Sequence, residues 1–297
     1  MTTAVVCLLL TVATLAQGVK ISPKMVKGMK KNYQMETVIK VAGKEFKMTA
    51  KQNVEVVDKL ADGYLLRCTL SDFSSNVGDD NVAGLLVAMG MQMTNGINTM
   101  LKTNADGKVL AIQNFDEMKQ KAVDMCDVLL NRFFEKMPEA AQMVPREELL
   151  AQLTGQLTEE NFINSMQSAS SVTALNGKTI ATGSQESFTS EQGLKMQRTY
   201  FLTKKDGSAL TSTARMNMTK DELKQMIIAQ LEKTMPDQAE MIKQNIDMMI
   251  GQMAFDATEK ATYEMGADGW VSSLTVENST DAMGQKTNST TTVKLAQ

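Results

Sequence analysis

The side chains that could do chemistry in this chain are limited, because it contains no histidine. Histidine is the commonest general base and the commonest zinc ligand, so its absence excludes Ser-His and Cys-His catalytic arrangements. Acidic pairs occur at Asp79-Asp80, Glu147-Glu148 and Asp221-Glu222. Each lies at an expected helix start, where a carboxylate stabilises the helix dipole, and none has calcium-loop spacing. We therefore predict no metal ion, no cofactor and no catalytic residue.

Serine, threonine, lysine and glutamate are plentiful, so the composition alone permits a Ser-Lys or paired-carboxylate mechanism. No spacing singles out such a pair. Gly84, Gly90 and Gly96 are evenly spaced but lack the Lys-Ser/Thr ending of a phosphate loop. A hydrolase of unknown type is therefore the third possible function.

Methionine is the one compositional feature that suggests a function. The chain has 25 methionines against 9 phenylalanines and one tryptophan. Methionine is flexible and polarizable, so methionine-rich surfaces accommodate varied apolar ligands, although it also fills gaps in cores that are poor in aromatic residues. Core filling is the favoured interpretation, because most of these methionines fall on apolar helix faces. The residues predicted to contact an apolar ligand, if one binds, are Leu85, Leu86, Met89, Met93, Met226 and Met249.

Residues 82–93 are apolar on every side, and no charge occurs from Val82 to Leu101. One interpretation is a mobile helix that covers a hydrophobic ligand or touches a membrane. The favoured one is a helix buried between a sheet and other helices. Polar residues interrupt the stretch at 92–96, so no membrane-spanning helix is predicted.

The N-terminus predicts export. Ala4 to Leu15 forms an apolar core, and Thr14 and Ala16 suit cleavage before Gln17. The signal peptide would then comprise residues 1–16, and the protein would be periplasmic or extracellular. A net charge of -3 predicts no nucleic-acid partner, since such proteins carry clustered lysine and arginine.

Two cysteines remain after signal removal, Cys68 and Cys126, and each lies on an apolar face of its expected element. In an exported protein they could form a disulfide. Free cysteine is also among the most buried residue types, and two free thiols are the favoured alternative.

Four Asp-Gly dipeptides position the expected strands: Asp62-Gly63, Asp106-Gly107, Asp206-Gly207 and Asp268-Gly269. Each lies between stretches of strand-like alternation, which predicts a hairpin with a two-residue primed turn and an exposed aspartate. None has the neighbouring oxygen ligands of a calcium loop.

The pattern predicts an α+β fold of antiparallel β-hairpins with interspersed amphipathic helices. About ten strands would form a curved sheet or half-barrel. The expected strands are 33–41, 46–57, 64–73, 97–103, 108–113, 178–189, 194–203, 209–218, 255–265, 270–277 and 287–295. The expected helices are 82–93 and 115–137, one from Pro145 to Gly155, one capped by Thr158, one opened by Thr219 to Glu222, and one from Pro236 to Gly251. Residues 19–31 are expected to be loosely ordered.

These elements predict two pseudo-repeated halves. The first β-meander and helix half spans 17–137, a helical connector spans 138–170, and the second half spans 171–297. The halves form either two units or one continuous domain.

Three short segments carry a family resemblance: Tyr33-Gln34-Met35 in the first strand, Asp106 to Val109, and the threonine-rich strand after Met283-Gly284-Gln285. Their order after a signal peptide resembles an uncharacterised family of exported bacterial envelope proteins, a domain of unknown function. The resemblance implies export and a β-rich domain and supplies no active-site residues. The layout of hairpins and helices also looks like the envelope lipoprotein-carrier proteins, at the level of fold only.

Two functions lead. The first is an exported non-enzymatic protein that binds an apolar ligand such as lipid, and it predicts a continuous apolar cavity. The second is a structural or protein-interaction module with a self-filled core, which predicts an exposed apolar patch or sheet edge. The sequence identifies no particular protein partner.

Overall fold

The computed structural model describes residues 18–41, 43–76, 92–136, 138, 145–155, 157–190, 193–234, 255–282 and 285–296. The ligand-contact candidates Leu85, Leu86, Met89 and Met249 lie outside these ranges, as do most of the expected helix 82–93 and the expected helix 236–251.

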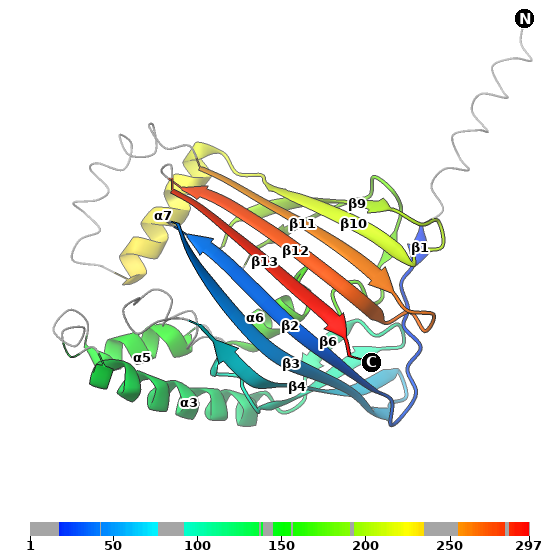
Figure 1. The fold of residues 1–297 in the computed structure, drawn as a ribbon, viewed down its shortest axis with the longest axis horizontal. Coiled ribbons are helices and arrows are strands. Elements are labelled where there is room, and N and C mark those ends of the chain that lie inside the picture. The colour runs from blue at the N-terminus through cyan, green and yellow to red at the C-terminus, as the bar shows by residue number, and fades with distance from the viewer. Residues whose placement is uncertain are drawn as a thin grey trace, which may run out of the picture.

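Eleven antiparallel strands form one open, curved sheet in the order β6-β5-β4-β3-β2-β13-β12-β11-β10-β9-β8 (Figure 1). The first half of the chain supplies β2 (Lys30–Val41), β3 (Lys44–Lys59), β4 (Gly63–Ser75), β5 (Asn98–Asn104) and β6 (Val109–Ile112). The second half supplies β8 (Gln185–Thr189), β9 (Lys195–Leu202), β10 (Ala209–Met216), β11 (Phe255–Met265), β12 (Val271–Ala282) and β13 (Gln285–Leu295). A separate pair joins β1 (Val19–Lys20) to β7 (Thr179–Ile180). The predicted hairpins and curved sheet are confirmed, although strands dominate over helices. The single strand expected at 178–189 is wrong, because this stretch forms two short strands, β7 and β8, in different sheets.

The two halves of the chain meet inside this sheet. Strand β2 pairs with β13 over a long register, from Val41 opposite Thr287 to Tyr33 opposite Leu295. The first strand of the meander and the last strand of the chain thus become central neighbours. The predicted boundaries at 138 and 170 stay predictions.

All four Asp-Gly hairpins lie at the same end of the sheet, because they join β3-β4, β5-β6, β9-β10 and β11-β12 in an antiparallel order. The hairpins are confirmed, but the primed-turn assignment is wrong. Gly107, Gly207 and Gly269 have positive φ, whereas no turn aspartate does. Each of these glycines donates its N–H to the carbonyl three residues earlier. This is a right-handed turn closed by a left-handed glycine, as in three-residue hairpin loops with a G1 bulge.

Gly63 is needed for a different reason. Its φ is not positive, but a Cβ at this position would lie 1.8 Å from the carbonyl oxygen of Thr103 on the neighbouring strand β5. The exposure predicted for the turn aspartates is correct at Asp62 and Asp206 only. Asp106 and Asp268 are half-buried because they pair with Lys20 and Lys31, at 2.7 Å and 2.6 Å.

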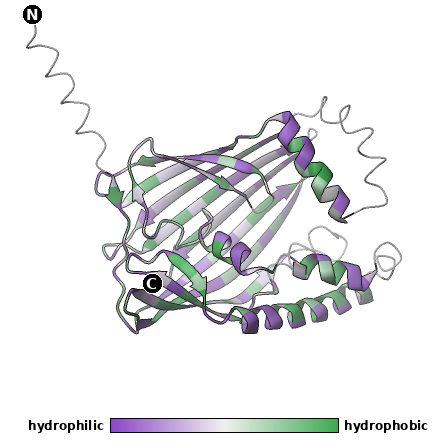
Figure 2. Ribbon diagram, turned by 180° about the vertical axis from the view of Figure 1, so that it is seen from behind, coloured by the Kyte–Doolittle hydropathy of each residue, from purple (hydrophilic) through white to green (hydrophobic). Residues whose placement is uncertain are grey.

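Within the described residues, four helices flank the concave side of the sheet: α3 (Phe115–Lys136), α5 (Arg146–Gly155), α6 (Glu159–Met166) and α7 (Lys220–Thr234) (Figure 2). Their predicted starts are confirmed. The Thr158 hydroxyl accepts from the Asn161 N–H, and Thr219 and Glu222 form the reciprocal hydrogen bonds of a capping box. In the part of the chain that the structure describes, no helix is long and apolar enough to cross a membrane.

The N-terminal segment 18–29 crosses the Asp-Gly end of the sheet and is well ordered, so the expectation of a loose segment is wrong. Ile21 and Met25 are buried in the core. The indole Nε1 of Trp270 donates to the Lys24 carbonyl at 2.9 Å. Ile21 and Met25 thus anchor this segment, whereas Val26 is exposed and the lysines point to solvent or to carboxylates.

A buried loop closes the concave side at the same end. All residues from 171 to 176 are buried, and their backbone groups bond to one another, as from Ala174 N–H to the Ser171 carbonyl. The Tyr263 hydroxyl donates to the Ala169 carbonyl at 3.0 Å and ties the sheet to this loop. We call this end, with segment 18–29 and loop 167–178, the closed end.

Candidate functional site

The concave face changes character along the strands. At the closed end it is apolar, with Leu210, Leu274 and Val293 fully buried. Two inward positions farther toward the opposite end, past the row that contains Ser212, Ala261 and Val276, a row of directly paired residues is polar. We call it the polar row, and it comprises Glu186, Arg198, Ala214, Glu259, Asn278 and Ser289. Directly opposed residues share a face of the sheet, so these side chains project together.

Arg198 is the centre of the polar row. Its side chain is 3% exposed, and its Nη1 lies 2.7 Å from Glu186 Oε1. Its Nη2 lies 2.8 Å and its Nε 3.2 Å from Glu259 Oε1. The guanidinium also stacks 4.1 Å from the centre of the Phe188 ring. A buried cation requires such compensation, because an unpaired charge in a protein interior is very costly.

Lys178 reaches the polar row from the closed-end loop. Its Nζ donates to both oxygens of Glu186, at 2.7 Å and 2.8 Å, and to the Tyr200 hydroxyl at 3.0 Å. Tyr200 in turn donates to Glu186 Oε1 at 2.6 Å. Two cations and two carboxylates thus form a network without net charge.

The electrostatics follow from burial and these partners. Burial lowers the pKa of Lys178, and the hydrogen bonds to Glu186 offset that effect only in part. Burial would raise the pKa of Glu186, but hydrogen bonds from Lys178 and Tyr200 outweigh it, so that pKa is lowered. Burial raises the pKa of Tyr200. The network is therefore held in its charged form around Glu186.

Solvent reaches the other end of the polar row. Glu259 is 15% exposed, and both of its hydrogen bonds from Arg198 go to Oε1. Asn278 is exposed and Ser289 is half-buried, with the Asn278 amide 3.5 Å from the Ser289 hydroxyl. A carboxylate, an amide and a hydroxyl therefore lie side by side on the concave face within reach of solvent.

A second apolar region lies beyond the polar row, under α7. We call it the open-end cluster. Its buried members are Leu194, Met196, Ala214, Leu223 and Ala257, and its partly buried members are Phe188, Met216, Met218, Met226, Ile227 and Phe255. It lies at the end of the sheet opposite the Asp-Gly turns, because α7 follows β10 there (Figure 1). More than half of its side chains keep some contact with solvent.

Of the sequence-predicted ligand contacts, two can be placed. Met226 belongs to the open-end cluster, where it is partly buried. Met93 is buried in a different cluster, against α3. The structure does not bring these two residues together.

The cysteines do not form the disulfide that was the less favoured alternative. Both thiols are free and buried. Cys68 packs in the main core, and Cys126 packs on α3 beside Met118 and Leu130, so they belong to different clusters. Burial raises the pKa of Cys68 to about 12.

The charged network was not predicted from the sequence, although the strand pattern carries a signal for it. In β9 the inward positions alternate as Met196, Arg198 and Tyr200, so one charge occurs on an apolar face. In β11, Glu259 similarly lies between Ala257 and Ala261. A charge at an inward strand position marks a buried pair or a site.

Ser212 lies directly opposite Tyr200, one member of this network. It is fully buried, and its hydroxyl has no hydrogen-bond partner within the described ranges. Substrate could not reach it in this conformation, so the geometry gives no support to a Ser-Lys nucleophile. No group of three or more acidic or cysteine ligands that could hold a metal ion occurs in the described part of the chain.

No family model matches this chain, and no curated protein does. The resemblance to exported envelope proteins therefore stays a prediction. Among solved structures, the chain is similar to one titled "Lipid-protein interactions in lipovitellin", with 8% identity and a TM-score of 0.41. That match covers 92% of this chain and 25% of the other, so this chain spans about a quarter of the lipovitellin chain. A porin-like protein from Bacteroides uniformis gives 11% identity and a TM-score of 0.20, with 92% and 98% coverage. Both likenesses are too distant to indicate a function.

Proposed function

We propose that the protein is a non-enzymatic binding protein that holds an amphiphile, such as a lipid, at the open end of its curved sheet. The apolar chain would lie on the open-end cluster beneath α7, and the polar end would lie against the accessible part of the polar row. The observation that carries the proposal is the adjacency of these two surfaces on one concave face.

The apolar part of the proposal depends on the side chains of the open-end cluster. Four of its members are methionines: Met196, Met216, Met218 and Met226. Unbranched methionine side chains change rotamer at low cost, so such a surface can adapt to an acyl chain. The closed end offers no comparable surface, because its own loop and N-terminal segment fill it.

The polar part concerns the head group. Arg198 and Lys178 are already paired with carboxylates, so they are not free to bind an anion. Glu259 supplies acceptors, Asn278 supplies an amide, and the Ser289 hydroxyl can donate or accept at the accessible side. We expect a head group with hydrogen-bond donors, such as an amine or hydroxyls. Export to the periplasm or the extracellular space belongs to the same proposal.

Native mass spectrometry of the protein purified from an exporting host tests this function. We expect a bound mass in the range of a lipid, which organic extraction removes and a fluorescent fatty acid replaces. Met226→Asp should abolish that binding, because a carboxylate would lie on the apolar surface. Gln225→Asp places the same charge on an exposed position of the same helix and should bind normally. Absence of any bound mass and of titration by the fatty acid would refute the proposal, as would equal binding by the two variants.

A second candidate, an interaction module, is favoured by one observation on the sheet edges. The β6 edge is covered, since Ile112 N–H donates to Glu159 Oε1 at 2.8 Å and the Gln167 amide donates to the Val109 carbonyl. On β8, the bonds from Tyr200 N–H to the Ser184 carbonyl and from Ser190 N–H to the Leu194 carbonyl fix which groups face β9. The backbone groups of Gln185, Ser187 and Thr189 face outward, and no described group pairs with them.

Such an edge can accept an extended strand from a partner, and it carries no lysine or proline to prevent this. Ser187→Pro would remove one outward N–H without touching the core. Loss of a complex in cross-linking or light scattering on this substitution would favour the interaction module, while unchanged behaviour would leave the ligand-binding function as the better account.

A further inference from the structure

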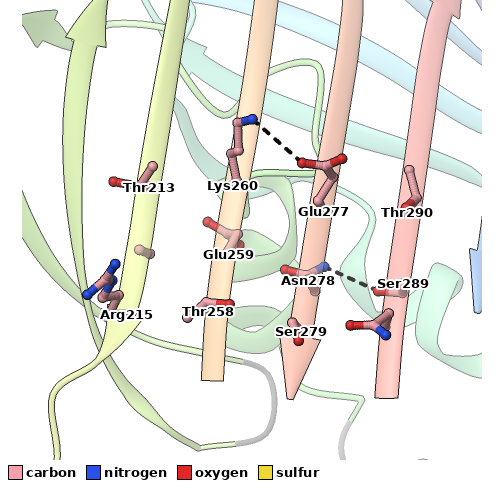
Figure 3. A pocket seen from close by; sticks show the side chains of 12 residues that line it. Thr213, Arg215, Thr258, Glu259, Lys260, Glu277, Asn278, Ser279, Ser289 and Thr290 are labelled. Carbon is pink, nitrogen blue, oxygen red and sulfur yellow. Dashed lines mark hydrogen bonds and ion pairs between the residues drawn. The ribbon is translucent and has the colours of Figure 1, made fainter. Parts of the chain in front are cut away.

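The outer face of the sheet carries a polar hollow that has no part in the proposed concave site. A hollow of about 450 Å³ extends over β10 to β13, and an adjoining one of about 270 Å³ lies over β9 and β10. The two share Thr213 and Arg215. Figure 3 shows the larger hollow with the side chains around it.

Strand register explains the shape of this hollow. One wall is the row Thr213, Lys260, Glu277 and Thr290, which are directly paired across four strands. The other wall is the row Arg215, Thr258, Ser279 and Asn288, paired in the same way. The polar row lies between them in sequence and projects to the opposite face, so backbone forms the floor. The hollow is therefore a valley between two outward rows of side chains.

Its walls are rich in groups that both donate and accept hydrogen bonds. Four hydroxyls come from Thr213, Thr258, Ser279 and Thr290, and an amide comes from Asn288. Neighbouring strands lie roughly 4.8 Å apart, so a polar group recurs at about that spacing along each wall. That spacing is comparable with the length of one sugar ring in an extended chain.

Arg215 gives the hollow a positive charge that no carboxylate of the described residues neutralises. Its direct neighbours on the outer face are Gln197 and Thr258, which are neutral. Within the described ranges no carboxylate lies at ion-pair distance from its guanidinium, whereas the other cation of the hollow, Lys260, lies 3.8 Å from Glu277. A planar guanidinium without a partner matches a carboxylate through two parallel hydrogen bonds.

An exposed aromatic ring adjoins these rows. Phe201 is 42% exposed and is paired with Thr211. Thr211 continues into a row of four paired threonines with Thr262, Thr275 and Thr292. An aromatic face beside hydroxyls offers a flat apolar surface for a sugar ring.

We propose that the outer face of β9 to β13 binds an acidic oligosaccharide, a chain of sugar rings that carries carboxylates. Arg215 holds a carboxylate, and the two polar walls hydrogen-bond the ring hydroxyls. This site is independent of the concave ligand site, because the two lie on opposite faces of the sheet.

Calorimetric titration of the full chain with oligogalacturonate tests the proposal, with its methyl ester as the matched probe that lacks the charge. We expect the acid form to bind and the ester to bind about tenfold more weakly. Arg215→Gln should weaken binding of the acid form by about tenfold at an unchanged melting temperature. Thr258→Val, which removes one wall hydroxyl, should weaken it by about threefold.

Lys294→Gln is the charge-matched control, since Lys294 is exposed on the same outer face, opposite Ser273 and away from the hollow. Its binding should equal that of the unaltered chain. The proposal is overturned if the acid form does not bind, if the ester binds equally well, or if Lys294→Gln and Arg215→Gln weaken binding to the same degree.

Discussion

The two ends of the curved sheet use apolar residues in different ways. At the closed end, side chains such as Trp270 and Leu274 are at most 2% exposed, and two chain segments lie over them. At the open end, Met226, Phe255 and four other apolar side chains are only partly buried under a single helix. One end resembles an ordinary protein core, and the other retains apolar surface on a concave face.

Under the proposed function, this difference is a division between folding and binding. The closed end ties together residues from both chain termini and from the loop between the halves, so it stabilises the fold. The polar row separates it from the open end, where apolar side chains stay partly exposed and the proposed ligand would lie. The substitutions below test that division, beginning with the largest expected effect.

Trp270→Ala should lower the free energy of unfolding by about 3–5 kcal/mol, because it leaves a large cavity in a buried site. It also removes the hydrogen bond that holds the Lys24 carbonyl. Denaturant unfolding measures the change. Phe201→Ala, at an exposed position of the same sheet, should stay within about 0.5 kcal/mol of the unaltered protein. Similar decreases in the free energy of unfolding for both variants would contradict a packed core at the closed end.

Gly107→Val should cost about 1–3 kcal/mol, because valine would have to adopt positive φ. Gly107 has φ +82, and a Cβ there would lie 2.5 Å from the Met25 Cε. Thermal unfolding checks this value. Gly155→Ala, which meets nothing within 4 Å at the end of α5, is the control and should not destabilise. An unchanged melting temperature for Gly107→Val would contradict the turn geometry.

Acid should weaken the polar row before it affects the closed end. The pKa of Glu186 is lowered in the folded protein, so the folded state binds fewer protons than the unfolded chain near its ordinary value of 4.5. The resulting stabilisation is complete above that pH and is lost as the pH falls through the lowered pKa. Stability of Glu186→Gln should therefore depend less on pH in this window than that of the exposed-site control Glu135→Gln. Parallel pH profiles of the two variants would show that Glu186 contributes no pH-dependent stability.

Met226→Ala should cost only about 1 kcal/mol, since the side chain is partly buried. Its effect on the amphiphile should be larger, because the side chain contributes to the proposed apolar surface. Denaturant unfolding and fatty-acid titration on the same sample separate the two effects. A stability loss as large as that of Trp270→Ala would mean that the open end is also a closed core.

The smallest expected effect is the reaction of the two thiols with a labelling reagent in the folded protein. In a Cys7→Ser background, Cys68 and Cys126 should not react with a thiol reagent at pH 8 under native conditions, because both are buried and burial raises the pKa of both. Both should react in denaturant. Native labelling of Cys68 would show that the closed end opens readily.

Local patterns accounted for much of the fold. The alternation around each Asp-Gly predicted the hairpins, the three- and four-residue steps predicted α3, and Thr219 with Glu222 predicted the start of α7. These signals depend on residues close in sequence, where backbone preference and capping act directly. The turn type was wrong because the same Asp-Gly pair suits either a primed turn or a right-handed turn followed by a left-handed glycine.

The candidate sites depended on contacts that are distant in sequence. Met226 was predicted and lies at the open end, but the charged network was not, because Arg198 meets Glu259 only when β9, β10 and β11 align. The outer hollow likewise requires four strands in one register. Neither arrangement can be derived from spacing along one strand.

The sequence by itself determined most of the strands, the helices that the structure describes and the positions of the hairpin turns along the chain, since periodicity and turn chemistry are local properties. Only the tertiary structure decided that β2 pairs with β13, that segment 18–29 and loop 167–178 close one end, and that the other end keeps apolar surface. The reason is physical: burial and charge pairing depend on which distant surfaces meet. A strand pattern shows that one face will be covered, but it does not show which segment covers it.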